Sequence, residues 1–253
     1  MTRIIACISG KGGSGKTTLV ANLGAALAEM GKDVVVIDAN LTTPNLGLHV
    51  GFPIMPITLH DVLKGKAKIN DAIYTHHKGL KIIPAGISIN DLQGIDARDL
   101  PNALLDILGN SEIVLIDASA GLGREALAAL ESADETLLIT NPELPAVMDA
   151  LKAIKMAENL GTKVTGVVLN RSTRKGHEMT KDEVRNMLDT EIIAEIPEDM
   201  SVKQAISKRV PVVYHKPTSY ASQEITKLAG RLVGENVVVN RPLHQRLFGF
   251  FSR

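Results

Sequence analysis

Short runs of apolar, often β-branched residues alternate along the chain with longer stretches of helical periodicity. Most of the apolar runs are continuous rather than alternating in polarity, which is typical of a parallel sheet covered on both faces. The runs predict strands at Ile4–Ser9, Asp33–Asp38, Leu80–Pro84, Ile113–Asp117, Glu135–Thr140, Lys163–Asn170 and Ile192–Ile196. Helices are predicted at Lys16–Met30, Leu100–Leu108, Ala146–Leu160, Lys181–Leu188, Val202–Lys208 and Ser219–Leu232. The alternation indicates an α/β fold with a doubly wound, mostly parallel sheet and helices on both faces.

Composition narrows the possible functions. Of the 253 residues, 45% are hydrophobic and 22% are charged, which is ordinary for a globular chain and excludes wholesale disorder. Lys and Arg together number 28, as do Asp and Glu, so no basic surplus indicates nucleic-acid binding, although a local basic patch stays open. The single cysteine, Cys7, cannot form an intramolecular disulfide or hold an iron–sulfur cluster alone. We therefore expect a protein of the reducing cytoplasm.

A glycine-rich segment joins the first predicted strand to the first predicted helix. It reads Gly10-Lys11-Gly12-Gly13-Ser14-Gly15-Lys16-Thr17-Thr18. This is a G-x-x-x-x-G-K-[ST] motif in the strand-to-helix context that such a motif requires. Its glycines let consecutive N–H groups turn towards a phosphate, and the helix N-terminus adds the positive end of a dipole. We expect Lys16 to reach the β- and γ-phosphates of a nucleotide and the Thr17 hydroxyl to bind Mg²⁺.

Lys11 adds a second positive charge early in this loop, from where it could reach a nucleotide held by another subunit. The K-G-G-x-G-K-T-T string resembles the deviant Walker A motif of the MinD/ParA family of dimerising ATPases, and the resemblance extends over nearly the whole chain. It is strongest to the archaeal-type MinD proteins, through Asn45-Leu46, Pro84-Ala85-Gly86, Asn141-Pro142-Glu143 and Ile196-Pro197-Glu198-Asp199. The resemblance implies an ATPase with catalytic lysines at Lys11 and Lys16.

Two aspartates end predicted strands. A carboxylate at the tip of a buried parallel strand faces the phosphate site and can hold a water bound to Mg²⁺, which makes Asp38 and Asp117 candidate metal contacts with Thr17. Capping of the following turn is the alternative explanation for each aspartate. By resemblance, residues 117–121 form the Walker B and switch II segment, in which many relatives carry proline where this chain has Ser119.

Two further loops follow the last predicted strands. The Asn170 side chain offers both a donor and an acceptor, which suits the edges of adenine, although a dipeptide such as Asn170-Arg171 is equally explained as a simple turn. The resemblance implies that this loop and the loop with Pro197 and Asp199 clamp the base, so that ATP rather than GTP is bound.

Acidic residues near the start of the following predicted helix are candidate dimer contacts. The resemblance implies that Glu143 and Asp149 engage the signature lysine, Lys11, and the ribose around the interface of an ATP-bound homodimer. The alternative is that acids near a helix start complement its dipole.

Residue 40 departs from the family pattern. Relatives usually have a D-x-D sequence whose second aspartate orients or activates the attacking water, whereas this chain reads Asp38-Ala39-Asn40. An amide can hold a water but cannot accept its proton. Because loss of a catalytic base costs about 10²–10⁴ in rate, we expect ATP binding with slow turnover.

The end of the chain has the pattern of an amphipathic helix. Its apolar stripe is formed by Leu243, Leu247, Phe248, Phe250 and Phe251. Arg241, Arg246 and Arg253 would face anionic headgroups. We therefore expect a P-loop ATPase domain at residues 1–235 and a linker with a membrane-targeting helix at residues 236–253. Packing of the same stripe on the body as a last core helix is the alternative.

The resemblance implies a cytoplasmic ATPase that associates peripherally with the inner face of the cell membrane and positions cell-division (septum) machinery. A division-inhibitor or activator protein is the expected partner, with no nucleic acid. Two alternatives stay open: a ParA-like DNA-partition ATPase, which would need a clustered basic surface, and a flagellum- or pilus-placement ATPase, whose core would look the same.

Overall fold

A computed structural model describes residues 1–52 and 54–237 of the chain. The predicted membrane-targeting helix therefore lies outside the described residues, and it stays a prediction. Within the described ranges, the helices are too short or too polar for any of them to cross a bilayer.

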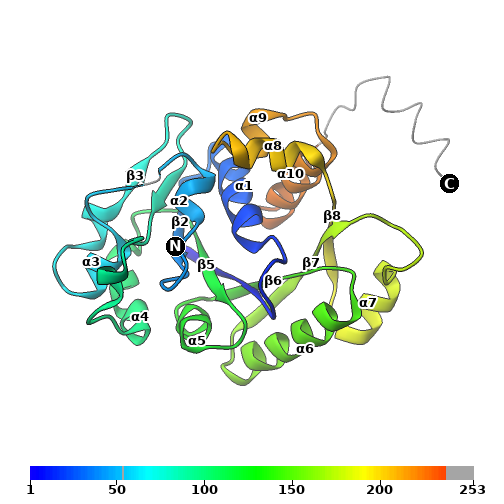
Figure 1. The fold of residues 1–253 in the computed structure, drawn as a ribbon, viewed down its shortest axis with the longest axis horizontal. Coiled ribbons are helices and arrows are strands. Elements are labelled where there is room, and N and C mark those ends of the chain that lie inside the picture. The colour runs from blue at the N-terminus through cyan, green and yellow to red at the C-terminus, as the bar shows by residue number, and fades with distance from the viewer. Residues whose placement is uncertain (53, 238–253) are drawn as a thin grey trace.

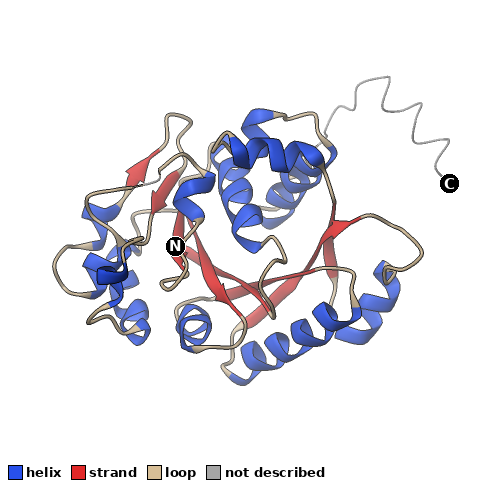
Figure 2. Cartoon of the chain, in the orientation of Figure 1, coloured by secondary structure: helices blue, strands red, loops and turns tan. Residues whose placement is uncertain are grey.

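The central element is an eight-stranded sheet with the order β3-β4-β2-β5-β1-β6-β7-β8 (Figure 2). Every neighbouring pair is parallel except β3 and β4, which are antiparallel. The strands are β1 (Arg3–Ser9), β2 (Val34–Ala39), β3 (Tyr74–Thr75), β4 (Lys81–Ile83), β5 (Ile113–Ala120), β6 (Glu135–Thr140), β7 (Lys163–Ser172) and β8 (Ile192–Pro197). The predicted fold class is confirmed. The two-residue β3 was not predicted from the sequence.

Helices cover both faces of the sheet (Figure 1). One layer contains α1 (Lys16–Glu29), α8 (Met200–Ser207), α9 (Val212–His215) and α10 (Tyr220–Leu232). The other contains α4 (Leu100–Leu104), α5 (Arg124–Glu131), α6 (Leu144–Asn159) and α7 (Lys181–Leu188). Short helices α2 (Leu46–His49) and α3 (Leu59–Leu63) follow β2, and 3₁₀ turns occupy Ile69–Ala72, Ile89–Leu92, Ala97–Asp99 and Leu105–Ile107.

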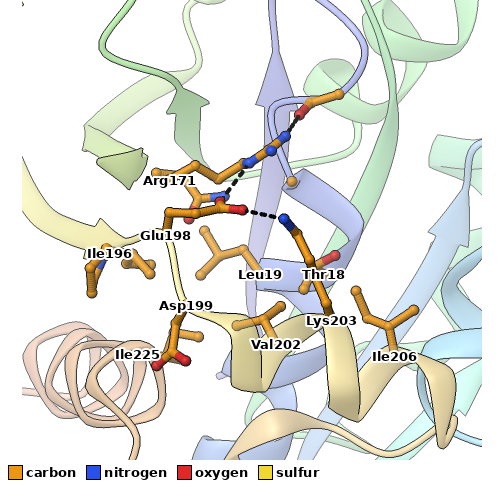
Figure 3. Close-up of a pocket in the computed structure, with 14 residues that line it drawn as sticks. Thr18, Leu19, Arg171, Ile196, Glu198, Asp199, Val202, Lys203, Ile206 and Ile225 are labelled. Carbon is orange, nitrogen blue, oxygen red and sulfur yellow. Dashed lines mark hydrogen bonds and ion pairs between the residues drawn. The ribbon is translucent and has the colours of Figure 1, made fainter. Parts of the chain in front are cut away.

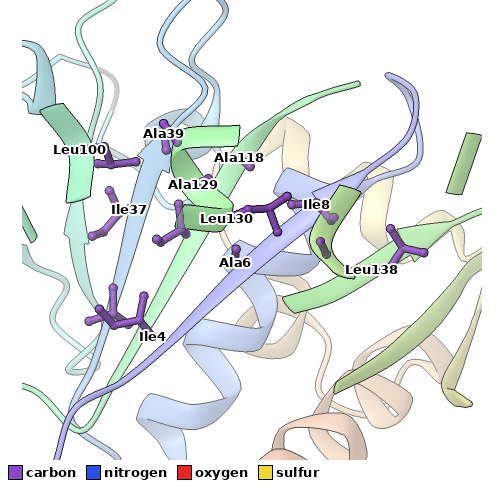
Figure 4. Packing of buried hydrophobic residues seen from close by; sticks show 14 of the residues in the cluster. Ile4, Ala6, Ile8, Ile37, Ala39, Leu100, Ala118, Ala129, Leu130 and Leu138 are labelled. Carbon is purple, nitrogen blue, oxygen red and sulfur yellow. The ribbon is translucent and has the colours of Figure 1, made fainter. Parts of the chain in front are cut away.

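The alternation of side chains along β1 divides the core between these layers. Ile4, Ala6 and Ile8 belong to the cluster under α5 and α6, where Leu130 and Leu138 pack beside them (Figure 4). The intervening Ile5 and Cys7 belong to the cluster under α1 and α10. Because both faces are buried, β1 is apolar from Ile4 to Ile8, which explains the continuous run in the sequence.

Candidate functional site

The glycine-rich segment turns tightly between β1 and α1. Gly13 and Gly15 have φ angles of 82° and 85°, in the left-handed region that favours glycine. A Cβ on Gly15 would lie 2.3 Å from Nδ2 of Asn170, and a Cβ on Gly10 would lie 2.3 Å from the Asp149 carbonyl group. The loop is therefore held between β7 and α6 in a form that only glycine permits.

Lys16 begins α1 and forms a buried ion pair. Its ammonium contacts Oδ1 of Asp117 at the carboxyl end of β5, and the two side chains are 6% and 0% exposed. Oδ2 of Asp117 is also buried but has no hydrogen-bond partner. Since buried polar atoms are almost always paired, this oxygen is a candidate to accept a hydrogen bond or to bind a cation.

Asp38 lies opposite Asp117 in the register of β2 and β5. Its carboxylate accepts hydrogen bonds from the backbone N–H groups of Asn40, Asn45 and Leu46, at 3.2, 3.0 and 2.9 Å. Burial, and then the nearby charge of Asp117, raise the pKa of Asp38 to about 7. The carboxylate fixes the path of residues 40–46 over the phosphate loop.

A hydrated Mg²⁺ ion fits these residues. The Thr17 hydroxyl lines the pocket around the phosphate loop, and the unpartnered oxygen of Asp117 supplies a hard acceptor. Among the described residues, no three His, Cys, Asp or Glu side chains gather closely enough to hold a metal ion by themselves. Substrate phosphates and water would have to complete the coordination, as is usual for Mg²⁺.

Asn40 lines the same pocket, but its amide is engaged in its own loop. Nδ2 donates to the Thr43 carbonyl oxygen at 2.7 Å, and Oδ1 accepts from the Thr43 hydroxyl at 3.1 Å. The side chain therefore closes the turn that follows β2.

The predicted base contacts line a pocket of about 290 Å³ that shares Gly13, Gly15 and Thr18 with the pocket around the phosphate loop (Figure 3). Its apolar lining comes from Leu19, Ile196, Val202, Ile206 and Ile225. Arg171 and Lys203 both pair with Glu198, each at 2.9 Å, and Arg171 also donates to the Gly13 carbonyl oxygen at 3.2 Å. These contacts connect the loop after β7 to the loop after β8 and to the phosphate loop.

Three of the predicted base contacts take different positions around this pocket. Asn170 donates to the Ser14 carbonyl oxygen at 2.7 Å and so supports the phosphate loop. Pro197 ends β8 in the pocket wall. Asp199 also lines the pocket, but its carboxylate accepts from the N–H groups of Ser201 and Ala221, at 2.8 and 3.2 Å, and thereby caps α8.

The predicted dimer residues lie close together beside the phosphate loop. Lys11 Nζ is 3.1 Å from Oε2 of Glu143, in a pair whose side chains are 34% and 62% exposed. Asp149 pairs with Lys152 at 3.0 Å, and its backbone contacts Gly10. Surface pairs of this kind contribute little to stability, so both acids and Lys11 are available to other contacts.

The fold brings to the site three residues for which the sequence predicts no role. The Asn141 amide donates to the Asn170 carbonyl oxygen at 3.0 Å. His49 joins the Thr18 hydroxyl, at 3.2 Å, to the Asn45 carbonyl oxygen, at 2.9 Å. Glu125 accepts a hydrogen bond from Thr42. The only sequence signal was for Asn141, within the Asn-Pro-Glu string.

Comparison with known proteins places this chain in a family. The family model described as the CobQ/CobB/MinD/ParA nucleotide binding domain matches residues 5–212. An uncharacterised ATP-binding protein of Methanocaldococcus jannaschii is 41% identical over 234 residues, covering 92% of this chain and 89% of that protein. The septum site-determining protein MinD of Thermotoga maritima is 34% identical over 269 residues, covering 100% of this chain and 98% of that protein.

Solved structures agree with the sequence relatives. MinD of Pyrococcus horikoshii, complexed with Mg-ADP, has a TM-score of 0.89 and 38% identity, covering 92% of this chain and 96% of that one. A chain of the MinC:MinD cell division complex of Aquifex aeolicus has a TM-score of 0.84 and 31% identity, covering 95% of this chain and 99% of that one. The resemblance drawn from the glycine-rich loop is thus confirmed, and the chain belongs to the CobQ/CobB/MinD/ParA family of nucleotide-binding proteins, with MinD proteins among its relatives.

Proposed function

We propose that the protein is a MinD-type ATPase, which binds ATP with Mg²⁺, dimerises, associates with the membrane and positions the septum machinery. The observation that carries this proposal is the loop with two lysines in different settings. Lys16 is buried against Asp117 at the base of the loop, whereas Lys11 is at the surface beside Glu143. One lysine is placed for the nucleotide of its own chain and the other for contacts outside it.

ATP binding requires Lys16 to exchange its partner. The Lys16 ammonium contacts Oδ1 of Asp117, and phosphate oxygens would replace that carboxylate. Backbone N–H groups of residues 10–16 and the N-terminus of α1 then face the phosphates. Mg²⁺, held through Thr17 and the carboxylates of Asp38 and Asp117, would neutralise charge on the β- and γ-phosphates. The apolar pocket between β7, β8 and α8 suits a purine ring.

Hydrolysis would transfer the γ-phosphoryl group to water. Lys16 stabilises the charge that develops on the phosphate oxygens, and the loop amides keep these oxygens in place. Asn40 can orient the water but cannot take its proton, and its amide is already bound to Thr43. We infer slow turnover and therefore a long-lived ATP-bound state.

Dimerisation would follow from Lys11. Its pair with Glu143 is half exposed, so exchange of the carboxylate for a phosphate of the opposing subunit costs little. A two-fold interface in which each Lys11 reaches the other nucleotide would make the dimer depend on ATP. Glu143 and Asp149 lie on the same surface and would contact the partner subunit.

Membrane association would come from the apolar stripe of residues 243–251. Each buried side chain contributes roughly 1.5–3 kcal/mol, against about 1–2 kcal/mol per residue for ordering the backbone. One copy would thus bind weakly, and two copies on one dimer would gain about 10²–10⁴ in avidity. The MinC:MinD complex of Aquifex aeolicus supports a division inhibitor as the partner.

Co-sedimentation with anionic liposomes in ATP, in ADP and without nucleotide tests these steps together. We expect binding only with ATP, and loss of binding after deletion of Leu243–Arg253 or in Phe250→Glu, with ATP affinity unchanged. Lys11→Ala should bind ATP but remain monomeric in light scattering. A full-length protein that stays monomeric at saturating ATP and Mg²⁺ would contradict the proposal, as would a tail-deleted protein that still co-sediments with ATP.

A further inference from the structure

His49 ends the short helix α2 and contacts the phosphate loop. It lines the same pocket as Lys16, Thr17 and Thr18. Its Nε2 is 3.2 Å from the Thr18 hydroxyl, and its Nδ1 is 2.9 Å from the Asn45 carbonyl oxygen. Thr18 also lines the pocket of the predicted base contacts. His49 therefore contacts a residue that the phosphate pocket and the base pocket share.

These two contacts determine the direction of the hydrogen bonds around the His49 ring. A carbonyl oxygen can only accept, so Nδ1 carries a proton and donates it to Asn45. In the neutral ring Nε2 is then an acceptor, and Thr18 has to donate its only hydroxyl proton to it. The Thr18 oxygen can then only accept on its pocket side. Phosphate oxygens also accept, so this arrangement does not suit a phosphate group.

Charged groups near His49 come from the elements around the two pockets. α2 packs on α1 and β2, which contribute Lys16 and Asp38. The pocket that shares Thr18 is lined by four more charged residues, Arg171, Glu198, Asp199 and Lys203. The cationic side chains among these residues all have an acidic partner in the chain. A bound triphosphate would therefore add negative charge beside His49, and a nearby negative charge favours the protonated form of histidine.

We propose that His49 is a positioning residue for the nucleotide, which acts through Thr18 and takes up a proton when ATP binds. The inference deepens the proposed ATPase function and rests on it. A proton from solvent adds to Nε2, which then donates to the Thr18 oxygen instead of accepting from it. The Thr18 hydroxyl proton is thereby released and is donated to a phosphate oxygen of the nucleotide. Nδ1 continues to donate to Asn45, so the ring needs no new partner.

Calorimetry of ATP binding in buffers of equal pH but different ionisation enthalpy measures the protons taken up. At pH 7 we expect the wild type to take up roughly half a proton to one proton more per ATP than His49→Gln, whose amide can donate to Thr18 without being protonated. His177→Gln makes the same change at an exposed histidine outside the pocket and should behave as the wild type. Equal uptake in the wild type and His49→Gln would overturn the proposal.

The pH dependence of ATP affinity gives a second measure. Uptake of one proton changes the Kd tenfold per pH unit, so between pH 6 and pH 8 the Kd of the wild type should rise roughly 3–10-fold more than that of His49→Gln. Subtraction of the variant removes the titration of ATP itself. Parallel pH profiles for the two proteins would contradict the proposal.

Thr18→Val tests whether His49 acts through the Thr18 hydroxyl. The substitution keeps the branched shape but leaves Nε2 without an oxygen to which it can donate. We expect the extra proton uptake to fall to the level of His49→Gln. If Thr18→Val takes up as many protons as the wild type, His49 responds to the nucleotide without Thr18 and the proposal is wrong.

Nitrogen NMR of isotope-labelled histidine distinguishes this role from a purely structural contact, with His49→Gln identifying the His49 signals. Without nucleotide we expect a neutral ring protonated at Nδ1, and with ATP a ring protonated at both nitrogens. A ring protonated at Nε2 without nucleotide, or one that stays neutral with ATP, would overturn the proposal. Absence of ATP binding in the wild type would refute the proposed function itself, and the inference with it.

Discussion

Carboxylates at the two ends of the central sheet differ in their hydrogen bonding and in the direction of their pKa shifts. At the amino end, Glu135 at the start of β6 accepts two hydrogen bonds from Arg3, at 2.7 and 2.9 Å, and one from Thr165, at 2.5 Å. The hydrogen bond from Arg3 is the main cause that lowers the pKa of Glu135 to about 2. At the carboxyl end, burial and Asp117 raise the pKa of Asp38 to about 7, and one oxygen of Asp117 is unpartnered.

This difference distinguishes a carboxylate that stabilises the fold from one that is kept for a ligand. Glu135 has its hydrogen bonds satisfied by its own chain, so its charged form is favoured and contributes to folding. Asp38 and Asp117 face each other across β2 and β5 with a single lysine beside them, so the fold alone leaves negative charge poorly compensated. A bound cation would therefore stabilise the carboxyl end of the sheet more than the amino end.

Lys16→Ala should have the largest effect of the substitutions considered at the carboxyl end of the sheet, on both stability and ATP binding. It leaves Asp117 buried without its cation, and removal of one partner of a buried ion pair costs about 3–5 kcal/mol. We expect the free energy of unfolding in urea to fall by this amount and ATP binding to be lost in calorimetry. Lys155→Ala, which removes an exposed pair with Glu158, is the control and should leave both nearly unchanged. Full stability in Lys16→Ala would mean that the buried Asp117 carboxylate does not depend on the charge of Lys16.

Asn40→Asp would add a third carboxylate to Asp38 and Asp117 at the carboxyl end of the sheet. We expect ATP turnover to rise at least roughly 100-fold, because aspartate can accept the proton of the attacking water. Steady-state phosphate release measures this, and Asn102→Asp makes the same chemical change at an exposed position of α4 as a control. Equal rates for wild type and Asn40→Asp, with and without an activator, would show that residue 40 does not limit turnover.

The sequence predicted the fold and the position of the glycine-rich loop because both depend on local patterns. The predicted strand Glu135–Thr140 and helix Lys181–Leu188 have the observed bounds, and the glycine-rich segment lies between β1 and α1. Asp38 and Asp117 meet because strands of one parallel sheet end at the same edge. The helix predicted over Leu100–Leu108 is instead α4 followed by a 3₁₀ turn.

The remaining features depend on tertiary contacts that no local pattern specifies. No helix was predicted at α5, a helix of eight residues that follows glycines at 121 and 123. The hydrogen bond between Thr42 and Glu125 joins residues that are 83 positions apart in the sequence. The sequence predicts that Asp199 contacts the base. In the structure α8 begins at Met200, directly after Asp199, so the Asp199 carboxylate caps this helix.

Glu135→Gln should weaken the amino end, in contrast to the effects at the carboxyl end. Hydrogen bonds to charged groups contribute about 1.5–3 kcal/mol, and we expect a loss in that range at pH 7. The pKa of Glu135 is about 2 in the folded chain, against about 4.3 when unfolded. The contribution is therefore complete above about pH 4.3 and is lost as the pH falls towards 2. Urea unfolding at several pH values measures it, and a difference between wild type and variant that does not shrink in acid would contradict this explanation.

Thr165→Val should give the smallest effect, because it removes a single hydrogen bond to Glu135 at the amino end of the sheet. The Thr165 hydroxyl donates to Oε2 of Glu135, which also accepts from Arg3, so this oxygen keeps a partner after the substitution. Val has nearly the shape of Thr and suits a strand, so little packing is lost. We expect the free energy of unfolding to fall by about 0.5–1.5 kcal/mol, with ATP affinity and turnover unchanged because the hydroxyl lies at the end of the sheet opposite the nucleotide. In the Glu135→Gln background the cost of Thr165→Val should be smaller, because a neutral amide accepts a weaker hydrogen bond than a carboxylate. An equal cost in both backgrounds would show that Thr165 stabilises β7 independently of the charge on Glu135.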